Sequence, residues 1–132
     1  MLLDDLSLYL TPELPYPVQN GFLQELPNEV VALRETGGFP SPHVLTSEPG
    51  LAVLDQPTVQ VVTRARDYVT AMLTARQAHA LLDGLREREL NGVLYQFIKA
   101  MQPPFFLSRD ENNRFLCAFN IHIQRRVPGL VA

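Results

Sequence analysis

The chain has one cysteine, no long apolar run and no basic leader, and each of these shortages excludes a class of protein. Because Cys117 is alone, it can form neither an intrachain disulfide nor a thiolate metal cluster. No stretch approaches the ~18 consecutive apolar residues of a membrane-spanning helix. Asp4 and Asp5 stand where a signal peptide would carry positive charge. We therefore expect no membrane association and a protein made in a reducing cytoplasm.

Positive charge is also scarce. The 132 residues include 11 Lys and Arg against 14 Asp and Glu, which gives a net charge of −3 and a pI near 5.5. The basic residues are scattered, whereas a dedicated nucleic-acid binder usually carries a basic patch. Hydrophobic residues make up 46% and charged residues 19%. This composition is typical of one globular domain spanning residues 1–132, and the low charged share favours a chain that hides surface in an assembly.

The three histidines are too far apart in the sequence to suggest a metal site. His79 falls in the apolar stripe of an expected helix, which favours a packed, hydrogen-bonded histidine. His122 falls on the polar face of an expected strand and is predicted to be exposed. His43 lies in a proline-rich loop, where contact with a partner is the alternative to an ordinary surface position. The sequence therefore predicts no metal ligands.

Residues for catalysis are not gathered in any motif. The adjacent acids Asp4-Asp5 and Asp110-Glu111 do not converge as a general acid and base, and the second pair is most simply turn chemistry. Gly37-Gly38 lacks the spacing of a phosphate-binding loop. Cys117 falls on the apolar face of the last strand, which predicts a buried and inert thiol. We expect no catalytic residue, no cofactor and no enzymatic activity.

Periodicity in the first half predicts a short amphipathic helix over residues 2–11 and a proline-rich connector over 12–28. A strand is expected over 29–35, a short one near 51–54, and a clear β-branched one over 58–64. Asp67 is placed to cap a helix that runs to about Leu85 and has an alanine-rich buried face.

The second half predicts strands. The run 86–89 (RERE) is expected to end the helix as a solvated face, although alternating Arg and Glu can also pair across subunits in an oligomer. Residues 93–101 form a strand that is apolar on both faces. In the closing hairpin, odd-numbered residues from Phe115 to Ile123 share one apolar face. The expected fold class is α+β, with a mostly antiparallel sheet, one long helix packed on it and a short N-terminal helix.

A resemblance to a known family rests on the pattern of these later elements. The stretch PTVQVVTR that begins at Pro57 matches a family pattern "p-x-v-q-v-x-x-R" ahead of the helix. Before the last strand, the family phrase "q-x-P-x-x-L-x-x-D-e-x-x-R" is matched by Gln102, Pro104, Leu107, Asp110 and Arg114. Over about residues 44–126 the chain resembles the small tail terminator proteins of long-tailed bacteriophages.

The resemblance implies a structural virion protein of the phage tail and neck. Such a protein is assembled in the host cytoplasm as a homo-oligomeric ring, typically six-membered, on the end of the tail tube. The ring ends polymerisation of the tube protein and offers a surface to the head–tail connector or stopper protein. DNA passes through the lumen without specific binding.

Within the resemblance, two projecting regions are candidate partner contacts. One is the glycine-rich loop, with Gly37, Gly38, Phe39 and His43. The other is the hairpin tip, with Arg109, Asp110, Glu111 and Arg114, which we expect to be exposed. Two alternatives remain at this point: another head–tail connector or tail-completion subunit, and a soluble α+β module that binds a ligand.

Overall fold

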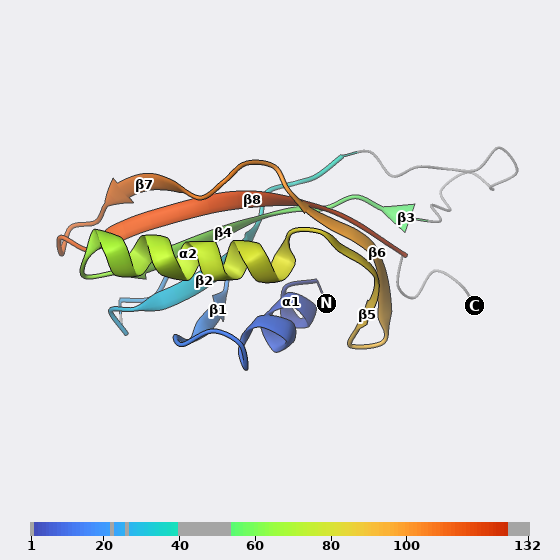
Figure 1. The fold of residues 1–132 in the computed structure, drawn as a ribbon, viewed down its shortest axis with the longest axis horizontal. Helices are drawn as coiled ribbons and strands as arrows, with labels where there is room; N and C mark the ends of the chain where they lie inside the picture. The colour runs from blue at the N-terminus through green and yellow to red at the C-terminus, as the bar shows by residue number, and fades with distance from the viewer. Residues whose placement is uncertain (1, 22, 26, 40–53, 127–132) are drawn as a thin grey trace, which may run out of the picture.

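The structure, a computed structural model, describes residues 2–21, 23–25, 27–39 and 54–126. Within them the chain forms two helices and eight strands, which Figure 1 labels. In chain order they are α1 (Leu2–Leu10), β1 (Val18–Asn20), β2 (Val30–Glu35), β3 (Leu54–Asp55), β4 (Thr58–Ala65), α2 (Tyr68–Leu82), β5 (Leu85–Leu90), β6 (Val93–Ala100), β7 (Phe105–Arg109) and β8 (Phe115–Arg126).

All eight strands belong to one sheet that is organised around β8. The strand order is β1-β2-β4-β8-β6-β5, and both β3 and β7 also pair with β8. Because β4 and β6 both pair with Ile121 and His122, they lie on opposite sides of β8. The short strand β3 continues the β4 side and β7 continues the β6 side. Every pairing is antiparallel except that of β1 with β2, which is parallel.

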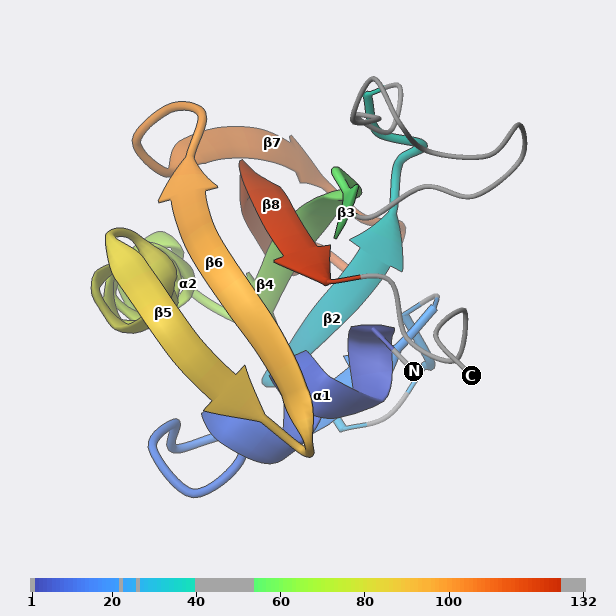
Figure 2. The same ribbon diagram turned by 90° about the vertical axis from the view of Figure 1, so that its right-hand side faces the viewer.

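The sheet curls, and both helices lie inside the curl (Figures 1 and 2). The helix α2 packs along β4 and β8, while α1 contacts β1, β2 and β5 and so covers the gap between the two ends of the sheet. Apolar side chains from the helices and the strands meet in one main core, which includes Leu6, Leu10, Val61, Phe119 and Ile121. The small residues Ala71 and Ala75 let α2 approach the sheet closely, beside Cys117.

A buried polar contact ties α1 to the sheet. Asp5 is 1% exposed, and it accepts hydrogen bonds from the Tyr95 hydroxyl at 2.6 Å and from Asn91 Nδ2 at 3.1 Å. Burial, followed by the bond to Asp5, raises the pKa of Tyr95 far above its usual value, so the hydroxyl keeps its proton and donates. The Arg125 side chain lies next to this hydroxyl and pairs with Asp55 at 3.0 Å.

Several expectations for local structure are confirmed. The N-terminal helix, the strands at 30–35 and 58–65 and the closing hairpin all form. Asp67 caps α2 by accepting from the Thr70 backbone N–H at 3.1 Å. On β8, Cys117, Phe119, Ile121 and Ile123 are buried as the alternation predicted. The packing expected of His79 is seen, since it is half-buried with its ring edge-on to Phe119 at 5.3 Å, while its expected hydrogen bond stays a prediction.

The predicted fold class is wrong. The described chain is mostly β, its curled sheet is mixed, and α2 has only 15 residues. Two strands were missed: β1 lies inside the connector expected over 12–28, and β5 occupies the charged run expected to end the helix. Pairing with a neighbouring strand overrode weak local signals in both places, since backbone hydrogen bonds do not depend on side-chain hydropathy.

We predict that Tyr95→Phe destabilises the fold by about 1–3 kcal/mol, because the Asp5 carboxylate loses a donor in a buried site. Chemical denaturation monitored by circular dichroism measures the change. The matched control is Tyr68→Phe, whose ring is 45% exposed and which should stay within about 0.5 kcal/mol of the natural chain. Equal losses for both variants would contradict the role assigned to the contact.

Candidate assembly surfaces

The hairpin tip between β7 and β8 is held by one carboxylate. Asp110 Oδ1 accepts from the backbone N–H groups of Asn112 and Arg114, both at 2.9 Å. Its other oxygen accepts from Arg114 Nε at 2.7 Å. Partial burial works against ionisation, but these hydrogen bonds prevail and hold the pKa of Asp110 below its usual value. The turn is therefore preformed and rigid.

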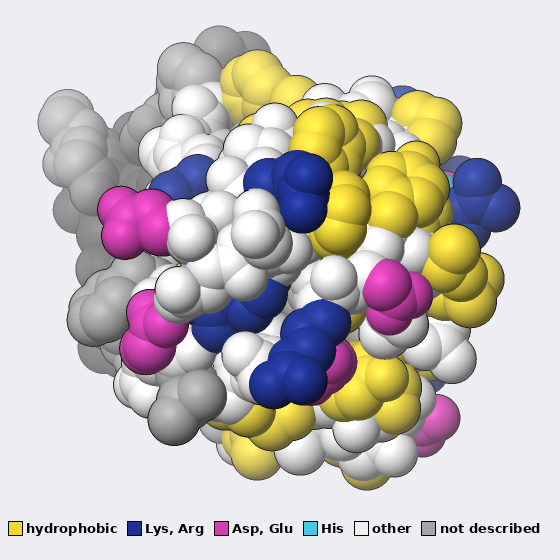
Figure 3. Space-filling view, turned by 90° about the vertical axis from the view of Figure 1, so that its left-hand side faces the viewer, with side chains coloured by type: hydrophobic (Ala, Val, Ile, Leu, Met, Phe, Trp, Pro, Cys, Tyr) yellow, Lys and Arg dark blue, Asp and Glu magenta, His cyan; other side chains and the backbone are white. Residues whose placement is uncertain are grey.

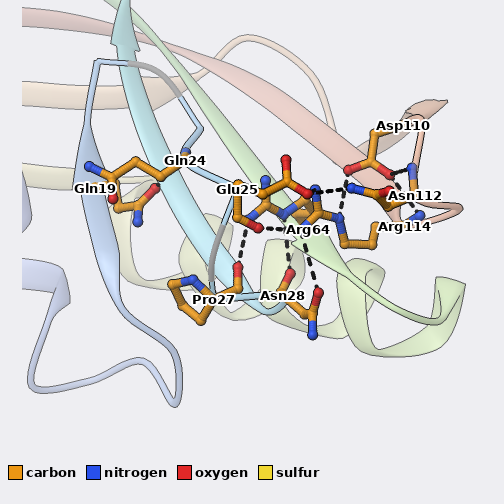
Figure 4. A network of polar contacts seen from close by, with 9 residues as sticks. All are labelled: Gln19, Gln24, Glu25, Pro27, Asn28, Arg64, Asp110, Asn112 and Arg114. Atoms are coloured by element: carbon orange, nitrogen blue, oxygen red, sulfur yellow. Dashed lines mark hydrogen bonds and ion pairs between the residues drawn. The ribbon is translucent and has the colours of Figure 1, made fainter.

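Two buried arginines join this tip to the connector before β2 (Figure 4). Arg64 is 3% exposed and Arg114 is 4% exposed. Arg114 Nη1 donates to the carbonyl of Glu25, and Arg64 Nη2 donates to the carbonyl of Pro27, each at 2.5 Å. Burial and the nearby charge of Arg114 lower the pKa of Arg64. We name Arg64, Arg114, Asp110 and the carbonyls of Glu25, Pro27 and Asn28 the arginine clamp.

The clamp changes the interpretation of the hairpin-tip candidates. The expected exposure of Arg114 is wrong, because its guanidinium is turned into the clamp and is committed to intrachain bonds. Asp110 is half-buried in the same network. Arg109 and Glu111 are exposed, and the Arg109 guanidinium lies over the Phe115 ring at 4.6 Å. Of the four candidates at the tip, these two remain available to a partner.

The glycine-rich loop is anchored to the convex side of the sheet. Phe39 is 47% exposed, donates its N–H to the Gln56 carbonyl at 2.8 Å and places its ring 4.6 Å from that of His122. Gly37 and Gly38 both have positive φ, at 100° and 127°. A Cβ on Gly38 would lie 2.6 Å from the Gln56 carbonyl oxygen, whereas one on Gly37 would meet open space. The fourth candidate, His43, lies outside the described residues.

His122 is part of this anchor. The expectation that it is simply exposed is wrong: it is half-buried, and it shares a hydrogen bond of 2.8 Å with the Gln56 side chain. The Phe97 ring stands edge-on to it at 5.2 Å. Burial, and next the charge of Lys99, lower the pKa of His122, so the ring is neutral at pH 7.

A third surface was missed by the sequence analysis. It consists of exposed apolar side chains on the outer face of α2 and on β7, which we call the α2–β7 surface: Tyr68, Val69, Leu73, Phe106 and Leu107. The Phe106 ring lies 6.2 Å from that of Tyr68 and 6.1 Å from that of Phe115. Hydrophobic side chains gather on this flank of the molecule (Figure 3). On α2, Val69 and Leu73 lie away from the alanine-rich face that the sequence predicted to be buried.

The described residues offer little for catalysis. In the ranges that the structure covers, no group of three or more His, Cys, Asp and Glu could hold a metal ion. Cys117 has no exposed surface, and burial raises the pKa of its thiol, which fits the predicted inert cysteine. None of the described helices is long and apolar enough to cross a membrane.

Comparison with known families identifies the chain. Residues 3–127 match the family model of bacteriophage tail terminator proteins. The chain belongs to this family. The resemblance seen in the sequence is thereby confirmed, and this tail terminator family member is a structural protein of the phage tail, located in the virion.

A solved structure shares the fold. One chain in the virion of a native gene transfer agent particle matches with a TM-score of 0.53 and 13% sequence identity. The match covers 92% of this chain and 84% of that one. A search of the curated proteins found no match. At this identity the structural match supports the fold, and the family assignment depends on the sequence model.

We predict that Arg114→Ala lowers the free energy of unfolding by about 1.5–3 kcal/mol, because the tip and the connector lose charge-assisted hydrogen bonds. Denaturant titration measures the loss. Glu111→Ala, three residues earlier in the same turn, is the control and should change stability by less than about 0.5 kcal/mol, because its side chain is exposed. If Arg114→Ala leaves the free energy of unfolding unchanged, the arginine clamp does not stabilise the fold.

We also predict that Gly38→Ala costs about 1–3 kcal/mol more than Gly37→Ala. Both substitutions strain a positive φ, but only the first drives a Cβ into the Gln56 carbonyl and displaces Phe39 from its bridge. Thermal unfolding of the two variants in parallel measures the difference. Equal unfolding temperatures for the two variants would mean that the loop can move away from the added Cβ without loss of stability.

Proposed function

We propose that this protein forms a ring on the end of the phage tail tube, where it ends polymerisation and provides the surface for head–tail joining. The observation that carries the proposal is the α2–β7 surface, five large exposed apolar side chains on a domain of a tail terminator family. Clustered apolar exposure of this kind marks a protein contact in soluble proteins. The proposed ring is a homo-oligomer, and the family resemblance implies that it has six subunits.

The fold supplies the rigidity that a ring subunit needs. The helix α2 is capped at Asp67 and packed on β4 and β8, so Val69 and Leu73 are presented on a fixed face. At the same flank the arginine clamp fixes the hairpin that carries Phe106. Side chains held in place before assembly lose less entropy on binding, which favours association.

The other candidate contacts fit the ends of such a ring. Glu111 projects from the preformed hairpin turn, and Phe39 is exposed beside the anchored glycine-rich loop. We propose that these residues contact the tube protein or the connector protein. The net charge of −3 suits a lumen through which DNA passes without phosphate contacts that would retain it.

A capping assay with purified tail-tube protein tests the proposal. The natural protein is expected to arrest tube elongation and to appear at tube ends in electron micrographs. Leu73→Asp should weaken capping by roughly tenfold or more, because it buries an unpaired carboxylate in the contact, while circular dichroism stays unchanged.

The matched control is Met101→Asp, which adds the same charge at a side chain that is 51% exposed and outside the α2–β7 surface. It is expected to cap nearly as well as the natural protein. Tubes that elongate without limit in the presence of the natural protein would contradict the proposal. Binding to isolated connector rings but not to tubes would instead identify a connector or tail-completion subunit.

A further inference from the structure

The strand β7 is an unprotected edge of the sheet. Among the described strands it pairs only with β8, and four of its five residues are exposed. Phe106 and Leu107 remain 46% and 42% exposed, and the register with β8 shifts between Phe106 and Ser108, so that Leu107 has no Cα partner there. Natural proteins usually shield an edge with charge, proline or a covering segment. An exposed apolar edge indicates that another strand covers it after assembly.

The strand β5 is a second edge, of opposite character. Within the described chain it pairs only with β6, and its exposed residues are Arg86, Glu87, Arg88 and Glu89. Glu87 has a φ of +46° and is the one residue of β5 without a Cα partner in β6. A non-glycine residue in this conformation is rare in a strand and is found preferentially at functional segments.

The two edges lie toward opposite ends of the molecule's long axis, and both follow the side of β8 that pairs with β6. In Figure 1, β7 is at the upper left and β5 is at the lower right. A ring contact is heterologous, so each subunit must present two different surfaces. A pair of unlike sheet edges meets this requirement, whereas a single self-complementary surface would give a two-fold dimer.

The chemistry of the two edges is complementary. The apolar edge carries an aromatic side chain, Phe106, and one cation, Arg109. The charged edge offers arginines that can cover an aromatic ring and glutamates that can pair with Arg109. The chain already makes the first kind of contact twice within itself, with the Arg88 guanidinium over the Tyr9 ring at 5.4 Å and that of Arg109 over the Phe115 ring at 4.6 Å.

We infer that β7 of one subunit pairs edge to edge with β5 of the next copy, so that the sheet continues from subunit to subunit around the ring. The occupant of the apolar edge is thus a second copy of this chain. The inference rests on the proposed ring and goes beyond it by assigning the two strands that close the contact.

Site-directed disulfides test the pairing. Leu107→Cys is combined in turn with Arg86→Cys and with Arg88→Cys. The two partners are two residues apart, so together they cover two possible registers in which the same side chains stay on the same face of the sheet. The buried Cys117 leaves the background unreactive. Mild oxidation of assembled rings should give a covalent ladder on a denaturing gel that reductant removes, because a disulfide needs Cα atoms within about 7 Å.

Control variants separate the possible outcomes. Glu111→Cys with Arg88→Cys places one thiol on the hairpin turn rather than on β7, and it should give no ladder. If both double-cysteine variants that contain Leu107→Cys form rings of the natural mass but give no ladder, the inferred β7–β5 pairing is overturned. The proposal that the protein forms a ring would still stand. Crosslinked dimers from Leu107→Cys alone would also overturn it, in favour of a two-fold contact. If the natural protein neither forms rings nor caps tubes, the proposed function fails as well.

Discussion

The alternation along β8 is the constraint on which the structure depends. One face of its 12 residues supplies Cys117, Phe119, Ile121 and Ile123 to the interior, and its two edges bind β3 and β4 on one side and β6 and β7 on the other. A shift of one residue in register would turn the whole apolar set outward. Strands from all parts of the chain are therefore aligned by one segment near its end, and the helices pack on the surface that results.

Buried polar contacts then fix the orientations of helices and loops that hydrophobic packing alone would leave adjustable. Asp5 and Tyr95 orient α1 across the gap in the curled sheet, and the arginine clamp fastens the hairpin tip to the connector. Such groups specify an arrangement because leaving any one of them unpaired costs more than pairing it gains. The outcome is a rigid flank with apolar side chains on its outside, which agrees with membership of the tail terminator family.

Sequence reasoning succeeded where the signal was periodic and local. The strand at 58–65, the Asp67 cap and the buried face of β8 follow from spacing and side-chain type. It failed for β1 and β5, which are strands only because a neighbour pairs with them. It also failed for Arg114, whose burial depends on the Glu25 carbonyl, 89 residues away. The α2–β7 surface was also missed, because apolar residues for a core and for a contact look alike in a sequence.

The central claim is that this domain completes its surface by associating with copies of itself. The most direct test is the solution mass of the natural chain by light scattering over a concentration series, alone and with tail-tube ends, together with negative-stain images. The account predicts closed rings with several times the 14.9 kDa of one chain, in solution or on the tubes. A monomer at every concentration, with tubes as well as without, would contradict it.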